Sequence, residues 1–112
     1  YISTTPPNTV TETAYHARGA CYFETGAYGS ALKDFEGALL LSKGKERKLD
    51  NMVCLASIYS RQNDKAKASQ YYRKALKIEP RLRHGSQVME KHGFVYLPKM
   101  KDAIAEITRK GL

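Results

Sequence analysis

Cysteine is scarce in this sequence and tryptophan is absent. Of the 112 residues, two are cysteines, Cys21 and Cys54, and neither belongs to a C-x-x-C pair or to a Cys/His cluster with zinc spacing. The scarcity argues against a disulfide framework, and the spacing predicts no metal site and no other cofactor. Unpaired cysteines favour a reducing compartment, so we expect a cytoplasmic location.

Long apolar runs are also missing. A transmembrane helix needs about 20 apolar residues, and no uninterrupted run, Ala38–Leu41 included, approaches that length. We therefore expect no membrane span. The chain begins at Tyr1 rather than at a methionine, so we expect that a preceding segment was removed, together with any targeting signal that it carried.

Patterns typical of catalysis are absent as well. The sequence has no G-x-x-x-x-G-K-[ST], H-E-x-x-H or G-x-S-x-G motif and no Ser/His/Asp arrangement. Its three histidines, His16, His84 and His92, are scattered and form no recognisable ligand set. We predict that the protein is not an enzyme and that it has no catalytic residues.

Positive charge is concentrated in the second part of the chain, from residue 43 onwards. Residues 1–42 carry two basic and four acidic side chains, whereas residues 43–112 carry seventeen basic and seven acidic ones. Such a half attracts acidic proteins, nucleic acid or anionic membranes, and a solvated exterior is the simpler interpretation. The densest basic set is Lys65, Lys67, Arg73, Lys74, Lys77, Arg81 and Arg83.

What is present is helical periodicity. Apolar residues recur at spacings of three and four between turn signals such as Gly26 and the pair Asn63–Asp64. Thr9 and Glu12 match a capping box at the first helix, and Pro98 suits the first turn of the last. We expect helices at about residues 11–25, 28–42, 48–61, 65–78, 86–92 and 98–110.

A repeat becomes visible when the sequence is shifted against itself by 37 residues. Similar residues then coincide: Gly19 with Ala56, Tyr22 with Tyr59, Ala31 with Ala68, Phe35 with Tyr72, and Ala38 with Ala75. Over residues 12–82 this pattern resembles the tetratricopeptide repeat, whose G-x-x-Y and A-x-x-x-F signatures recur about every 34 residues. Tyr15 and Met52 stand where the family has tryptophan, and three extra residues near 43–47 predict a longer connection.

The resemblance implies an all-α fold, an α-α superhelix of antiparallel helical hairpins. It implies small residues at the tight helix crossings and tyrosines between paired helices. We divide the chain into a flexible N-terminal arm (1–10), a first repeat (11–45), a second repeat (48–82) and C-terminal capping helices or a degenerate third repeat (83–112). We expect this chain to be part of a longer protein or of an assembly.

The resemblance also implies a function, because the first helix of each unit in this family lines a concave groove that receives a peptide or a partner helix. Carried over by position, the groove residues are Thr13, His16, Ala20, Phe23, Glu24, Asp50, Val53, Ser57, Ser60 and Arg61. We therefore expect a protein–protein interaction scaffold. The alternatives are a basic helical module that binds nucleic acid or an anionic surface, and a regulatory domain of a larger protein.

Overall fold

The computed structural model describes residues 11–84, 87–91 and 98–109, and these fold into helices joined by short turns. Those residues contain no strand, and this confirms the all-α prediction. The predicted N-terminal arm and the end of the last helix lie outside the described residues. The elements are α1 (Glu12–Glu24), α2 (Tyr28–Leu41), α3 (Lys45–Arg61), α4 (Lys65–Ile78), the short 3₁₀ helix η1 (Pro80–His84), α5 (Gln87–Lys91) and α6 (Pro98–Arg109).

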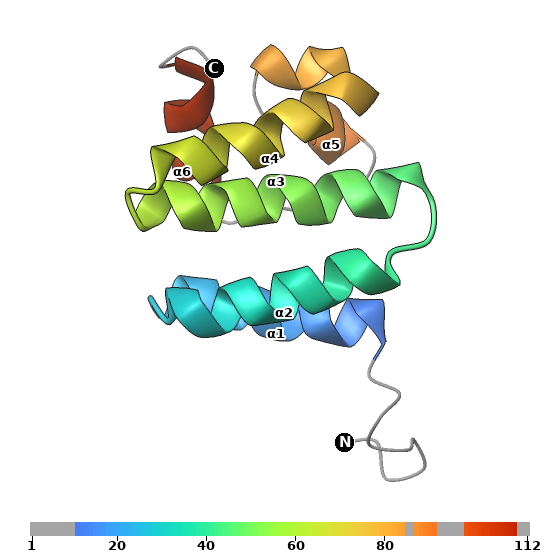
Figure 1. Ribbon diagram of the computed structural model, residues 1–112, viewed down its shortest axis with the longest axis vertical. Coiled ribbons are helices and arrows are strands. Elements are labelled where there is room, and N and C mark those ends of the chain that lie inside the picture. Colours follow the sequence, from blue (N-terminus) through green and yellow to red (C-terminus); the bar gives the residue numbers. More distant parts are fainter. Residues whose placement is uncertain (1–10, 85–86, 92–97, 110–112) are drawn as a thin grey trace, which may run out of the picture.

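The first four helices form two antiparallel hairpins that stack on each other. Helix α1 packs against α2 and α3 against α4, while α2 packs against α3 and so joins the hairpins. Figure 1 shows the two hairpins as two layers, with α2 and α4 nearer the viewer than α1 and α6. This is the superhelical arrangement that the repeat predicted.

Local chemistry explains where α1 and α4 begin. The Thr11 side chain accepts a hydrogen bond from the Ala14 amide at 3.1 Å, and the Asp64 carboxylate accepts one from the Lys67 amide at 3.2 Å. Because α1 begins at Glu12 with Thr11 as its cap, the predicted capping box from Thr9 is wrong. Asn63 adopts a φ of 63°, a left-handed conformation that asparagine tolerates well.

The connection between the hairpins is shorter than the sequence suggested. Helix α3 begins at Lys45 rather than Lys48, directly after Gly44, whose φ of 89° suits glycine. The extra residues therefore lengthen α3 by almost a turn instead of lengthening the loop. The reason is that Lys45, Glu46 and Arg47 have good helix propensity once the glycine has made the turn.

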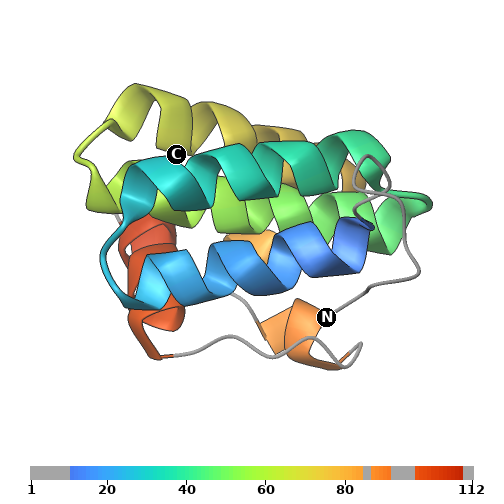
Figure 2. The same cartoon turned by 90° about the horizontal axis from the view of Figure 1, so that it is seen from below.

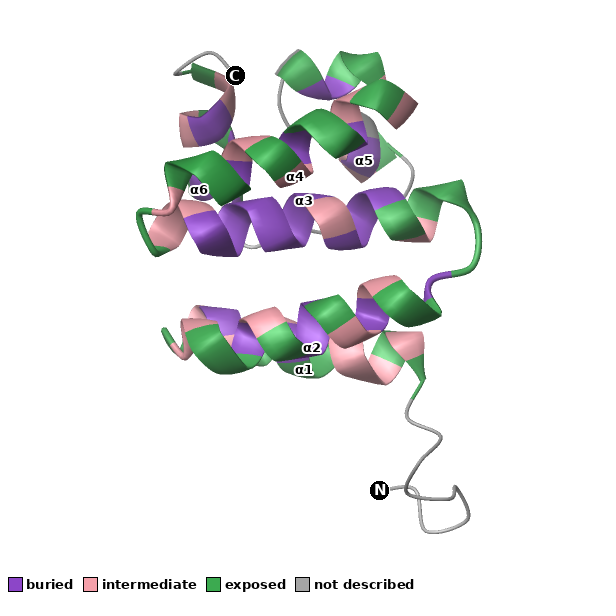
Figure 3. Cartoon of the chain, in the orientation of Figure 1, coloured by how far each residue is buried: buried purple, intermediate pink, exposed green. Residues whose placement is uncertain are grey.

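Small residues lie where the helices approach most closely. A Cβ atom on Gly19 would come within 2.9 Å of the Phe35 ring, and Ala56 is fully buried. Between the paired helices, Tyr22 is half-buried, while Tyr59 is 8 % exposed and stacks on Tyr71 with ring centroids 5.6 Å apart. The described structure thus has the close crossings and the interhelical tyrosines that the repeat predicted. Figure 3 shows α3 as the most continuously buried helix.

The C-terminal elements cover α3 and α4 rather than extending the stack regularly. The Tyr72 hydroxyl donates a hydrogen bond to the Leu82 carbonyl, which fixes η1 beside α4. Helix α6 packs against α3, and it buries the four residues that its periodicity placed inward, Met100, Ala103, Ile104 and Ile107. Among the described residues, no helix is both long and apolar enough to cross a bilayer.

Candidate functional site

The predicted groove corresponds to the inner side of the stack, formed by α1 and α3. Figure 2 shows α5 and α6 on this side and α4 on the opposite side. Helix α1 leaves Thr13 exposed and His16, Ala20 and Glu24 half-buried, whereas Phe23 is buried. On α3, Asp50, Val53 and Ser57 are buried, and Ser60 and Arg61 are half-buried. The α1 part of the face is therefore more accessible than the α3 part.

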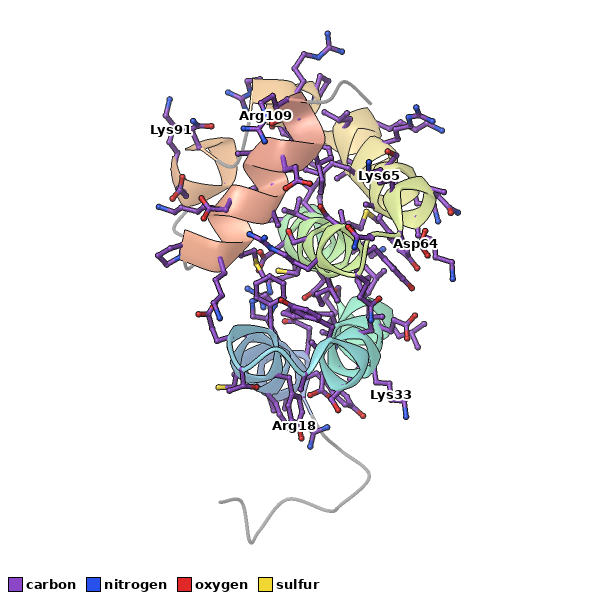
Figure 4. The ribbon with its side chains drawn as sticks, turned by 90° about the vertical axis from the view of Figure 1, so that its left-hand side faces the viewer. Arg18, Lys33, Asp64, Lys65, Lys91 and Arg109 are labelled. Carbon is purple, nitrogen blue, oxygen red and sulfur yellow. The ribbon has the colours of Figure 1, made fainter. Side chains whose placement is uncertain are left out.

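Helix α6 is the reason for this difference. The Met100 Sδ atom lies 3.6 Å from the Cys54 Sγ atom in the middle of α3. Arg61 donates a hydrogen bond to the Lys99 carbonyl, and the Lys99 ammonium donates one to the Glu24 carbonyl, both at 3.0 Å. Figure 4 looks along α1 to α4 and shows α6 beside α3, running across the direction of these helices. Within the described chain, α6 thus covers the α3 half of the predicted groove.

A partly buried polar network joins α1 to α3 at the other end of this face. Arg47 donates two hydrogen bonds to the Glu12 carboxylate, at 2.9 and 2.6 Å, and the Asn51 amide donates one to the same carboxylate at 3.0 Å. Burial by itself would raise the pKa of Glu12, but the hydrogen bonds from Arg47 and Asn51 outweigh it and lower that pKa. These residues set how the two leading helices lie against each other.

The match to known proteins agrees with this arrangement. The family model described as tetratricopeptide repeat matches residues 10–80. The chain belongs to the tetratricopeptide repeat family. It is also 33% identical over 69 residues to a protein named photosystem I assembly protein Ycf3 from Cyanophora paradoxa. This match covers 62% of the chain and 40% of that relative, so the chain spans well under half of the relative's length. No solved structure matches the chain.

Sequence reasoning did not identify one group of side chains on the inner face of this tetratricopeptide domain. His16 from α1 meets Asp50 and Cys54 from α3, and their possible ligand atoms all lie within 4.8 Å of one another. The histidine is more than thirty positions away from the other two in the sequence, so no spacing motif could have revealed the cluster. When the sequence is shifted by 37 residues, His16 aligns with Val53, the neighbour of Cys54 in the sequence. This alignment was the one sequence signal that related the histidine to the cysteine.

The predicted basic set lies on α4 and η1, the side of the repeats away from α6. All seven residues are exposed, and several have partners within the chain. The Lys67 and Lys74 ammonium groups lie over the rings of Tyr59 and Tyr71, 5.4 and 5.1 Å from the centroids. Arg81 pairs with Glu79 at 2.9 Å and lowers the pKa of that carboxyl to about 2.

The aromatic residues of this surface are not arranged for stacking on bases. The Tyr72 side chain is fully buried, and burial raises the pKa of its hydroxyl. Tyr71 is half-buried and stacks on Tyr59. Binding of a single-stranded nucleic acid uses exposed rings beside cations, and these two tyrosines do not provide such rings.

Proposed function

We propose that this tetratricopeptide domain is a non-catalytic scaffold that binds an amphipathic helix or an extended segment of a partner protein on its inner face. The observation that carries the proposal is α6. It buries Met100, Ala103, Ile104 and Ile107 while its other side stays largely exposed. The inner face thus already accommodates an amphipathic helix of this chain, and apolar residues at spacings of three and four are how such grooves recognise helices.

The part of the face that is open to a partner runs along α1, from its first turn to the start of α6. Thr13 and Ala17 are exposed there, and Ala20 and Glu24 are half-buried. One carboxylate oxygen of Glu24 is buried and has no hydrogen-bond partner among the described residues. Small side chains let a partner approach the α1 backbone, while the carboxylate favours a partner with a lysine or an arginine at that point.

The comparison with the assembly protein indicates what kind of scaffold this could be. That relative is named as an assembly protein of photosystem I. We propose the same general role here, in which the domain holds a protein subunit through its inner face. Identification of the bound protein would show which complex the domain helps to assemble.

The test is site-specific photocrosslinking with two matched positions. Ala17 on α1 and Ala66 on α4 are both exposed helical alanines, on the inner and outer sides of the repeats. A photoreactive amino acid at residue 17 should give a discrete covalent adduct in cells of the source organism, whereas one at residue 66 should not. The substitution Ala17→Arg should abolish recovery of the same protein by co-purification, and Ala66→Arg should leave it unchanged. Equal adducts at both positions would rule out the inner face as the binding surface.

A further inference from the structure

The inner face contains a compact set of nitrogen, oxygen and sulfur ligands contributed by α1 and α3. His16 belongs to α1, Asp50 and Cys54 belong to α3, and Met100 of α6 lies over them. Asp50 and Cys54 are 1 % exposed and Met100 is 5 % exposed. Neutral imidazole, carboxylate and thiolate are the groups that bind Zn²⁺ in proteins. The chemistry of the group therefore differs from that of an ordinary surface cluster of acidic residues.

The hydrogen bonds around His16 direct one ring nitrogen into this set. The Asn51 amide nitrogen donates to the Glu12 carboxylate at 3.0 Å and to the Ser42 hydroxyl at 2.8 Å. A carboxylate only accepts, so this contact fixes the orientation of the amide and turns its oxygen toward His16 Nδ1, 2.8 Å away. Nδ1 must then carry the proton, and in the neutral ring the lone pair of Nε2 points toward Asp50. Partners of this kind orient histidine ligands in metal sites.

Two acceptors consequently face each other across a gap that suits a metal ion. His16 Nε2 lies 3.4 Å from Asp50 Oδ2, which is long for a hydrogen bond between a charged donor and a carboxylate. Two ligand atoms bonded to one tetrahedral zinc ion lie roughly 3.3–3.8 Å apart. Cys54 Sγ lies 3.9 Å from Asp50 Oδ1 and 3.6 Å from Met100 Sδ. The three ligand atoms all lie within 4.8 Å of one another, so binding of one ion would draw the widest pair closer by up to about 1 Å.

The charges near the set also suit a divalent ion. Arg47 lies 3.7 Å from Asp50 Oδ2, and this cation opposes metal binding. Its guanidinium is, however, also held by both oxygens of Glu12. The two carboxylates and the guanidinium together carry one negative charge, so Zn²⁺ with an ionised Cys54 and a neutral His16 would make the group neutral. A neutral buried group has a lower desolvation cost than a charged one.

We propose that His16, Asp50 and Cys54 form a Zn²⁺ site on the inner face of the domain, with the Met100 side chain packed over it and a water molecule as the fourth ligand. Binding replaces the Cys54 thiol proton with the ion and releases that proton to solvent. The ion enters beside the His16 ring, whose side chain is 23 % exposed. Once bound, it ties α1 to α3 beneath α6.

The test is a zinc titration of the reduced 112-residue chain at neutral pH, in competition with a chromophoric chelator. One equivalent should bind, and the midpoint of thermal unfolding should rise with zinc concentration. Replacement by Co²⁺ should give the intense visible bands of a tetrahedral site and a thiolate-to-cobalt charge-transfer band. Binding without a charge-transfer band would exclude Cys54 as a ligand and would overturn the proposal, as would no binding at all.

Matched variants separate this site from adventitious binding. Cys54→Ser should remove the charge-transfer band and weaken zinc binding by at least about tenfold, whereas Cys21→Ser alters an exposed cysteine on α1 and should change neither. His16→Gln should weaken binding to a similar degree. Circular dichroism should show that this variant keeps the helix content of the wild type. Equal losses in the Cys54 and Cys21 variants would overturn the proposal even if the wild type binds zinc. The result is independent of partner binding, because every readout uses the isolated chain.

Discussion

Gly19 is the residue at which the first hairpin depends most on the absence of a side chain. An added Cβ would lie 2.9 Å from one carbon of the Phe35 ring and 3.2 Å from the Asp34 Cβ. Phe35 is fully buried and cannot move freely, so Gly19→Ala forces α1 and α2 apart. We expect a loss of about 1–3 kcal/mol from overpacking, offset by about 1 kcal/mol of improved helix propensity. Chemical denaturation should therefore show a net decrease in the free energy of unfolding.

The control for this change is a helical glycine of the same hairpin that has open space around it. Gly29 in the first turn of α2 has no atom within 4 Å of an added Cβ. Gly29→Ala should leave stability unchanged or raise it by about 0.5 kcal/mol, because alanine is a better helix former. If both variants behaved alike, the crossing at Gly19 would be looser than the structure indicates.

Glu12 makes the stability of the domain depend on pH. Its pKa is lower in the folded protein than the value of about 4.3 typical of an unfolded chain. The folded state therefore binds fewer protons near that pH, and this stabilisation is present above about pH 4.3 and is lost as the pH falls through the folded pKa. We expect Glu12→Gln to lower the free energy of unfolding at neutral pH and to flatten its decline in acid, as measured by urea unfolding at several pH values.

A second substitution changes Arg47, the cation that lowers the pKa of Glu12. Arg47→Lys keeps the charge but cannot donate two parallel hydrogen bonds to Glu12. The acid-dependent decline should accordingly become smaller than in the wild type without disappearing. An unchanged decline in both variants would mean that other carboxylates cause it.

Among the elements, α6 determines how much of the inner face is open. Ile104 on its buried side is 1 % exposed, and truncating such a residue costs about 2–5 kcal/mol. We expect Ile104→Ala to release α6 before the repeats unfold, because α6 packs mainly on α3. The measurement is the rate at which a thiol reagent labels Cys54, which is buried while α6 is in place.

The same molecule contains its own references for this experiment. Cys21 is exposed, so the thiol reagent should label it at the same rate in the wild type and in the Ile104 variant. Ala105→Ser changes an exposed residue of α6 and should leave the labelling of Cys54 slow. Slow labelling of Cys54 in the Ile104 variant would show that α6 stays docked through its remaining contacts.

The elements also show which parts of the fold the sequence could predict. The bounds of α4 agree with its apolar spacing, since Asp64 provides a cap and Pro80 follows its end. The start of α3 could not be predicted, because the same lysine- and glutamate-rich segment suits a loop or a helix until Gly44 makes the turn. The apolar spacing of α6 predicted which of its residues are buried. The packing of α6 against α3 could not be predicted, because it is a long-range contact that periodicity does not specify.

The candidate site divides in the same way. Position in the repeat predicted which residues of α1 and α3 face inward, yet it could not show that Val53 and Ser57 are buried. Burial of α3 residues depends on its packing against α2, α4 and α6, and α6 lies outside the two clear repeats. The meeting of His16 with Asp50 and Cys54 requires the packing of α1 against α3, and this is likewise a property of the folded chain.

At the scale of the whole molecule, α3 connects all the other packed layers. The domain is elongated, with principal extents of 46 × 27 × 22 Å, and α3 packs against α2, α4 and α6. Stability in stacked repeats is approximately the sum of the units and their interfaces. A change in α3 should therefore weaken both hairpins, whereas a change within the first hairpin should weaken the second much less.

Leu55 and Phe35 test this asymmetry, because both are fully buried, one in α3 and the other in α2. Leu55→Ala should cost about 2–5 kcal/mol and should lower hydrogen-exchange protection in α1, α2, α4 and α6 alike. Phe35→Ala should cost about 3–5 kcal/mol, with its loss of protection concentrated in α1 and α2. If Leu55→Ala left protection in α1 and α2 intact, the first hairpin would be stable without its neighbour. The polar contacts of Glu12, Arg47 and Asn51 would then be holding together two independently folded units.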